Sequence, residues 1–269
     1  MQSQDKDSVN EIEEYEKYHL ADKSFEWLYS FNRQNRVFDF IVNENYQKVL
    51  EVGIGTYPLA CNSLNKSIIL NKTKLKVASV EPSRTFVDLL HDRKRDDIDC
   101  QVFEDTLEAI NESQVCDFLG GFPELVVLNS LLHEITDLEN FFLKLRNIID
   151  NNSKIWINVP NISSLHHQLF SKINGITNLI EQDEHRSKIS NRKRMFDSES
   201  LIRLMNSFDF RCVKISSFGF KPFTFSQLEC CYESPEHRKL VTKEVLSRVE
   251  IRELYGAELE AIFESQDEY

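Results

Sequence analysis

Two closely spaced glycines follow an acid at the end of an apolar segment. The segment reads VLEVGIGT at positions 49–56, and it holds two of the seven glycines in the 269-residue chain. Glycine is required where the backbone turns with positive φ, or where a ligand lies directly against the main chain. An apolar strand that ends in such a turn predicts a strand-to-helix loop that binds a cofactor.

Acids also end the next two apolar segments. Glu81 follows residues 77–80, and Glu104 and Asp105 follow residues 100–103. In a doubly wound sheet the tips of neighbouring strands lie side by side, and an acid at the second tip can accept both hydrogen bonds of a ribose diol. An acid at the third tip could accept from an adenine amino group, and the sequence leaves open whether Glu104 or Asp105 does so. This pattern favours an adenosine-type cofactor.

The glycine spacing disfavours NAD. Dinucleotide sites show G-x-G-x-x-G, in which the third glycine lets a helix pack close to a pyrophosphate. Here Pro58 stands at the position of the third glycine, after Gly53 and Gly55. Glu51, two residues before Gly53, would oppose a pyrophosphate but would suit a cationic ligand, such as the amino group and sulfonium of S-adenosylmethionine.

Alternating strands and helices must position these residues. Apolar segments predict strands at 48–52, 75–80, 98–103, 125–128 and 154–159, with helices from 58, from 83, near 107 and over 138–149. Such alternation indicates parallel strands with right-handed crossovers, and therefore a doubly wound, Rossmann-like α/β sheet. Apolar residues at helical spacing predict N-terminal helices within 1–44, which we expect to cover the site.

The chain after residue 160 carries additional elements. We expect the main domain to span 45–232, with a helical and loop substrate cap as an insertion at about 162–196. Asp197 is the predicted N-cap of a helix, which a strand at 210–218 follows at the edge of the same sheet. The tail, 233–269, predicts two helices whose exposed faces could form a homodimer.

Composition limits the partners. The formal net charge is −12, whereas nucleic-acid binders carry a basic face, so we expect neither nucleic acid nor a membrane surface as partner. Six cysteines lack metal-ligand spacing, and we expect no metal ion. The polar N-terminus and the absence of a run of about 18 apolar residues predict a cytoplasmic protein.

These motifs resemble those of the class I S-adenosylmethionine-dependent methyltransferases. The resemblance covers roughly residues 45 to 230, and its main motifs are E-x-G-x-G at 51–55, Glu81, the acidic turn 104–105, and segments 126–135 and 157–161. Segments 163–166, 194–197 and 221–227 look like a subgroup that modifies small molecules or saccharides. The resemblance implies a mainly parallel, seven-stranded sheet and S-adenosylmethionine as cofactor. One departure is Tyr57, because many members carry a third glycine there.

The resemblance also implies which residues contact the cofactor. Those implied contacts are Glu51, Gly53, Gly55 and Thr56 at the methionine end, Glu81 and Pro82 at the ribose, Asp105 and Thr106 at the adenine, and Asn129 and Ser130 at the centre. The candidates for binding the methyl acceptor are Tyr57, Asn161, His185, Arg194 and Lys221. His185 and Arg194 belong to a basic cluster that could attract a carboxylate or phosphate on the acceptor.

Two histidines are candidates for a general base. His133 follows the fourth strand and His166 follows the fifth, at the sheet edge where open α/β sheets bind ligands. An imidazole titrates near neutral pH and could take a proton from an acceptor hydroxyl or amine, although a packing histidine is an equal alternative. The predicted function is methyl transfer to an oxygen or nitrogen of a small metabolite. The alternatives are a binding module of the same fold without turnover, a nicotinamide-dependent oxidoreductase and, least favoured, an RNA methyltransferase.

Overall fold

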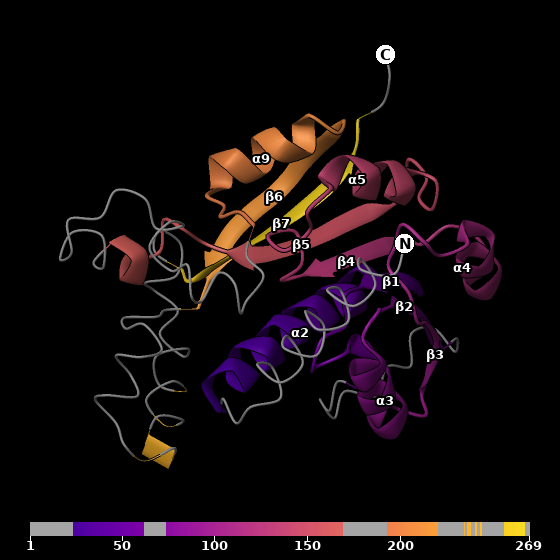
Figure 1. Cartoon of the computed structure of the whole chain (residues 1–269), viewed down its shortest axis with the longest axis horizontal. Helices are drawn as coiled ribbons and strands as arrows, with labels where there is room; N and C mark the ends of the chain where they lie inside the picture. The colour runs from indigo at the N-terminus through magenta and orange to yellow at the C-terminus, as the bar shows by residue number, and fades with distance from the viewer. Residues whose placement is uncertain are drawn as a thin grey trace, which may run out of the picture.

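The computed structural model describes residues 24–61, 74–168, 193–219 and 256–266, together with residues 234, 236, 237, 240 and 243. Its centre is one seven-stranded sheet with strand order β3-β2-β1-β4-β5-β7-β6 (Figure 1). The strands are β1 (Lys48–Val52), β2 (Leu75–Val80), β3 (Ile98–Phe103), β4 (Leu125–Asn129), β5 (Lys154–Pro160), β6 (Phe210–Phe218) and β7 (Glu258–Ser265). Strands β1 to β5 are parallel, and β7 runs antiparallel to both β5 and β6. The predicted mainly parallel seven-stranded sheet is therefore confirmed.

Helices cover both faces of the sheet. They are α2 (Ser24–Glu44), α3 (Arg84–Arg93), α4 (Glu112–Leu119), α5 (Leu138–Arg146) and α9 (Ser198–Asn206), with a short 3-10 helix η1 at Leu59–Cys61. Helices α5 and α9 lie on one face and α2 and α3 on the other (Figure 1). Ser83, Asp137 and Asp197 each accept a hydrogen bond from a backbone N–H in the first turn of the helix that follows, which confirms Asp197 as an N-cap.

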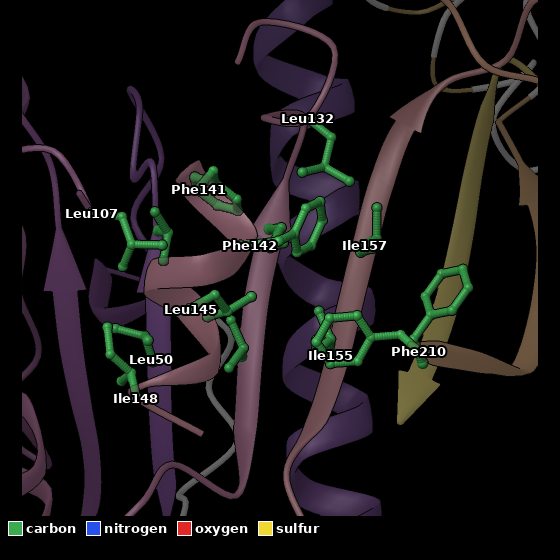
Figure 2. Close-up of a cluster of buried hydrophobic side chains, with 14 of the residues drawn as sticks. Leu50, Leu107, Leu132, Phe141, Phe142, Leu145, Ile148, Ile155, Ile157 and Phe210 are labelled. Carbon is green, nitrogen blue, oxygen red and sulfur yellow. The ribbon is translucent and has the colours of Figure 1, made fainter. Parts of the chain in front are cut away.

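The larger core lies between the sheet and α4, α5 and α9. Figure 2 shows Phe142 of α5 beside Ile157 of β5 and Phe141 on the side of Leu107, and all four side chains are buried. On the opposite face, Val37, Phe38 and Ile41 of α2 pack against the sheet, and each is fully buried. Parallel strands covered on both faces must be apolar on both faces, and this explains the continuous apolar segments in the sequence.

Two sequence predictions about elements are wrong. The segment at 258–265, expected to be helical, is the strand β7. Its alternating residues Leu259, Ala261 and Phe263 join the larger core. The intervening acids hid this alternation, because a buried face that carries carboxylates does not look apolar. The helix expected near residue 107 is also absent, since that segment forms turns and α4 begins at Glu112.

Those acids are buried because α2 supplies arginines. Arg36 forms two hydrogen bonds to the Glu260 carboxylate, one of them 2.6 Å from Nε to Oε2. Arg33 Nε lies 3.6 Å from Glu258 Oε2. A bidentate arginine–carboxylate pair fixes orientation as well as proximity. These ion pairs therefore fasten the N-terminal helix α2 to the C-terminal strand β7.

Several predictions fall outside the described residues. They include the first N-terminal helix, most of the insertion at 162–196, and most of the first tail helix. The homodimer stays a prediction. Residues 258–265 cannot provide an exposed helical face for it, because they form the strand β7. Among the residues that the structure describes, no helix is both long and apolar enough to cross a membrane.

Candidate functional site

The loop after β1 requires glycine at both expected positions. Gly53 has φ +74° and Gly55 has φ +54°, in the left-handed region that other residues rarely adopt. A Cβ on Gly53 would also lie 3.0 Å from Leu131 Cδ1, whereas a Cβ on Gly55 would meet nothing within 4 Å. The Gly53 N–H donates to Val80 O at 2.9 Å and so ties the loop to β2. The loop is thus a tight turn with open space beside its second glycine.

Glu81 at the tip of β2 organises this loop. Its Oε2 accepts from the N–H groups of Ile54 at 2.9 Å and Gly55 at 3.3 Å, and its Oε1 accepts from Ser83 N at 2.9 Å. Burial raises the pKa of Glu81 despite these hydrogen bonds. An ionised carboxylate has about four acceptor positions, so it can still accept a hydroxyl hydrogen from a ligand. The structure therefore puts the predicted ribose acid at the glycine loop.

Glu51, at the end of β1, is hydrogen-bonded to residues on both sides of the same loop. Its side chain is 1% exposed, and it accepts hydrogen bonds from Leu59 N at 3.0 and 3.1 Å and from Gln34 Nε2 at 3.0 Å. Burial, reinforced by the charge of Glu81, raises the pKa of Glu51 to about 8. Glu51 thus links β1, η1 and α2, and its predicted contact with the methionine end of the cofactor stays a prediction.

Several acidic side chains lie at this edge of the sheet. Burial and hydrogen bonds have the largest effects on both pKa values. The charge of Glu134 also raises the pKa of Glu81, and the charge of Glu81 also raises the pKa of Glu51. Carboxylates that disfavour one another's ionisation are stabilised by a nearby cation. The site therefore favours a positively charged ligand over an anionic one such as a pyrophosphate.

The tip of β4 carries backbone strain and a buried polar atom. Ser130 has φ +55°, although it is not glycine, and its N–H donates to Asn158 O at 2.8 Å. Such conformations cost about 1 to 3 kcal/mol and cluster at functional sites. Asn129 Nδ2 donates to Gln34 Oε1 at 3.3 Å, while Asn129 Oδ1 is buried without a partner among the described residues. Both residues lie where the resemblance places the centre of the cofactor.

The third strand tip narrows the choice of adenine partner. Glu104 Oε2 is paired with Arg84 Nη1 at 2.5 Å on the exterior of α3. Asp105 Oδ1 accepts from Thr106 N at 2.8 Å, and both of these residues are exposed. Asp105 is thus the better candidate, because Glu104 is already engaged by a cation. Pro82 is exposed beside Glu81. The contacts of Pro82, Asp105 and Thr106 with a cofactor stay predictions.

Both histidines are buried and have polar side chains next to them. His133 is 3% exposed, and its Nε2 lies 3.4 Å from Glu134 Oε1. His166 is 8% exposed, its Nδ1 lies 3.0 Å from Ser164 Oγ, and its ring lies 4.1 Å from that of His167. Neither residue's role as a base is tested by this arrangement.

Two acceptor candidates have structural partners. The Tyr57 ring packs edge-on against Phe31 of α2, with 5.5 Å between ring centroids. Asn161 is 3% exposed, and its Nδ2 donates to Gly256 O at 2.8 Å while its Oδ1 accepts from Ser163 N at 3.0 Å. Asn161 thus joins the end of β5 to the segment entering β7. Thr56 lies half-buried in the glycine loop, and its contact with a cofactor stays a prediction.

Arg194 holds the loop that follows β4. Its guanidinium donates to the carbonyl oxygens of Leu132, Ile135 and Thr136. The backbone N–H of Arg194 also donates to His133 O, at 3.3 Å. This arrangement supports a structural role, and acceptor binding by Arg194 stays a prediction. His185 and Lys221 lie outside the described residues.

Gln34 of α2 is the site residue that sequence reasoning missed. It is 4% exposed and donates from Nε2 to Glu51 Oε1 and to Tyr57 O, the latter at 2.7 Å. One signal could have revealed it. Gln34 occupies the first position of an i, i+3, i+4, i+7 stripe whose other members are Val37, Phe38 and Ile41. A polar side chain within an apolar stripe requires a buried partner.

The fold is similar to that of solved methyltransferase structures. The described fold is similar to a putative S-adenosylmethionine-dependent methyltransferase from Listeria monocytogenes, with TM-score 0.51 and 12% identity over 88% of this chain and 98% of that one. It is also similar to magnesium protoporphyrin IX methyltransferase from Synechocystis PCC 6803, solved with bound SAH, with TM-score 0.50 and 9% identity over 88% and 83% of the two chains. Neither a protein-family model nor a curated protein sequence matches this chain.

The chain therefore has the fold of the class I S-adenosylmethionine-dependent methyltransferases. At this level of identity the comparison establishes the fold, and the chemistry has to be argued from the residues of the site.

Proposed function

We propose that the protein transfers a methyl group from S-adenosylmethionine to an oxygen or nitrogen of a small metabolite or saccharide-like acceptor. The observation that carries the proposal is the loop of Gly53 and Gly55 held by the Glu81 carboxylate at the tip of β2. It combines close access to the backbone with an acid placed for a ribose diol, at the edge where open α/β sheets bind ligands.

The charge of the site supports S-adenosylmethionine rather than a nicotinamide dinucleotide. Glu51, Glu81 and Glu134 lie beside the loop, and burial together with mutual repulsion disfavours the ionised forms of Glu51 and Glu81. A sulfonium cofactor would stabilise these ionised forms, whereas a pyrophosphate would disfavour them further. In the proposed arrangement Glu81 accepts from the ribose, Asp105 from the adenine, and the strand-four residues Asn129 and Ser130 lie near the sulfur.

The protein's own contribution to the reaction is positioning and exclusion of water. The bound sulfonium supplies an activated methyl group and a good leaving group, so the displacement needs little covalent assistance. The loop after β4, which Arg194 holds through three carbonyl groups, would align the acceptor. His133 is the first candidate to take a proton from the acceptor and His166 the second, because both lie beyond the relevant strand tips.

Isothermal titration calorimetry with S-adenosylmethionine tests the cofactor assignment. We expect binding in the micromolar range, and no heat at hundreds of micromolar with a folded sample would remove the proposal. Addition of NADH to the same sample is the comparison that would favour the oxidoreductase instead. Incubation of the protein with methyl-labelled cofactor and a fractionated metabolite extract then tests turnover. Binding without any labelled product would favour a binding module of the same fold.

A further inference from the structure

The side-chain amide of Gln34 has a single orientation that satisfies its neighbours. Its Nε2 lies 2.7 Å from the Tyr57 carbonyl oxygen and 3.0 Å from Glu51 Oε1. A backbone carbonyl can only accept, so the amide nitrogen must face it. The Gln34 oxygen is consequently directed to its remaining neighbour, Asn129, at 3.3 Å.

That orientation determines which atom Asn129 presents. Because Gln34 offers an oxygen, Asn129 must offer its Nδ2, and a flipped amide would place two oxygens together. Asn129 Oδ1 is therefore turned away from Gln34, and it is buried without a partner among the described residues. The hydrogen bonds that link Tyr57 O, Gln34 and Asn129 therefore leave Asn129 Oδ1 as a buried acceptor at the tip of β4.

The residue opposite Asn129 shows the same feature. Asn158 of β5 pairs in register with Asn129, and its side chain is 1% exposed. Asn158 Nδ2 donates to Leu259 O at 2.8 Å, so its amide orientation is also determined, and its Oδ1 lacks a partner in the described part of the chain. Buried acceptors are rarely left unsatisfied, so these oxygens require a hydrogen-bond donor that the described residues do not supply.

We propose that Gln34 is a positioning residue that holds Asn129 with its carbonyl oxygen as the acceptor for an N–H donor of the bound ligand, beside the transferred methyl group. An N–H donor also suits the acidic side chains of this edge, of which Glu51 shares Gln34 with Asn129. The inference rests on the proposed function, because that function places the cofactor centre at Asn129. The inference assigns a role to Gln34 of α2, which belongs to no recognised motif, and it assigns an N–H donor as the ligand group that Asn129 binds.

Two cofactor analogues test this inference without knowledge of the acceptor. S-adenosylhomocysteine has a neutral thioether at the reacting position, whereas sinefungin carries a protonated primary amine there. We expect the wild-type protein to bind sinefungin about tenfold or more tightly than S-adenosylhomocysteine, since a hydrogen bond to a charged group commonly contributes that much. Gln34→Met, which keeps the length of the side chain and removes its hydrogen bonds, should reduce this preference to within about threefold.

Controls separate positioning from the docking of α2. Val37→Ala weakens α2 packing through a fully buried apolar residue of the same helix that cannot hydrogen-bond to Asn129, and it should keep the preference. Asn129→Ala should abolish the preference, and adding Gln34→Met to it should remove nothing further, because Gln34 acts through Asn129. Gln34→Leu replaces the Met variant if that variant does not fold.

The outcomes are distinguishable. Retention of the tenfold preference by Gln34→Met would overturn the inference, as would an equal loss in Val37→Ala. Equal binding of both analogues by the wild-type protein would also overturn it, and would assign the two acceptor oxygens to a shared buried water. Failure of the wild-type protein to bind either analogue would instead refute the proposed function.

Discussion

Replacement of Glu81 by glutamine tests the link between loop organisation and cofactor binding. The carboxylate accepts three backbone N–H groups through both oxygens, those of Ile54, Gly55 and Ser83. An amide has only one oxygen, so its NH2 group must face at least one of these donors. Glu81→Gln therefore loses hydrogen bonds that the acid makes, while relieving the burial of a charge.

The two effects on stability oppose each other. A buried donor left unsatisfied costs about 1 to 3 kcal/mol, and removal of a desolvated carboxylate returns part of this. We expect the free energy of unfolding to fall by about 1 kcal/mol. The effect on cofactor binding has no such compensation, because the amide provides a weaker, neutral acceptor to the ribose. Loss of a charge-assisted hydrogen bond of about 2 kcal/mol raises the dissociation constant for S-adenosylhomocysteine by about thirtyfold.

Calorimetric titration of S-adenosylhomocysteine measures this change, with thermal unfolding of the same samples. Glu104→Gln is the matched control, since Glu104 is an acid at the neighbouring strand tip and is engaged by Arg84. The control should bind as the wild-type protein does. A folded Glu81→Gln variant that binds within about threefold of wild type would refute the assignment of Glu81 to the ribose.

Three further changes test the surrounding structure. Gly53→Ala should lower the free energy of unfolding by about 2 kcal/mol in urea titrations, because alanine disfavours the positive φ of this position and its Cβ would contact Leu131. An unchanged urea midpoint would show that the turn does not need glycine. Burial raises the pKa of Glu51 from 4.5 to about 8, so between these values the folded chain retains a proton that the unfolded chain has released. Stability should thus fall with rising pH across that window by up to about 1 kcal/mol per pH unit, and urea unfolding of Glu51→Gln should show a shallower fall; equal slopes would contradict the raised pKa. Arg36→Met should lower the unfolding free energy by about 2 kcal/mol by leaving the buried Glu260 carboxylate unpaired, and the double variant with Glu260→Met should recover most of that loss; an additive loss would show that the pair does not hold α2 to β7.

The local features of the fold were predictable from the sequence because each follows from short-range chemistry. Gly53 and Gly55 indicated a turn with positive φ, and both adopt it. Asp197 indicated a helix start, and its side chain accepts from Ser200 N there. The edge strand at 210–218 was predicted with the bounds that the structure shows. Propensity, capping and turn chemistry agree with the global fold at these positions.

The remaining features depend on contacts between distant segments. Strand β7 was hidden because Glu258 and Glu260 alternate with its apolar residues, and only the arginines of α2 make their burial favourable. Gln34 was missed for a related reason, since its partners Glu51 and Asn129 lie on other elements. Buried polar groups are selected by tertiary partners, which local periodicity does not report.

The acceptor is the part of the site that the fold determines least. The residues expected to bind it include His185 and Lys221, outside the described residues, and Arg194, whose guanidinium is bound to three carbonyl oxygens. Specificity in α/β folds resides in loops attached to the sheet, so the common fold carries little information about it. Identification of the acceptor therefore depends on the labelled-methyl assay.

A crystal structure of the protein with S-adenosylhomocysteine would locate the cofactor site. We expect the ribose hydroxyls on the Glu81 carboxylate, the adenine beside Asp105, and the sulfur near Asn129 and Ser130. Ligand density at a different edge of the sheet, or its absence from crystals soaked at saturating concentration, would contradict the assignment of the glycine loop as a cofactor site.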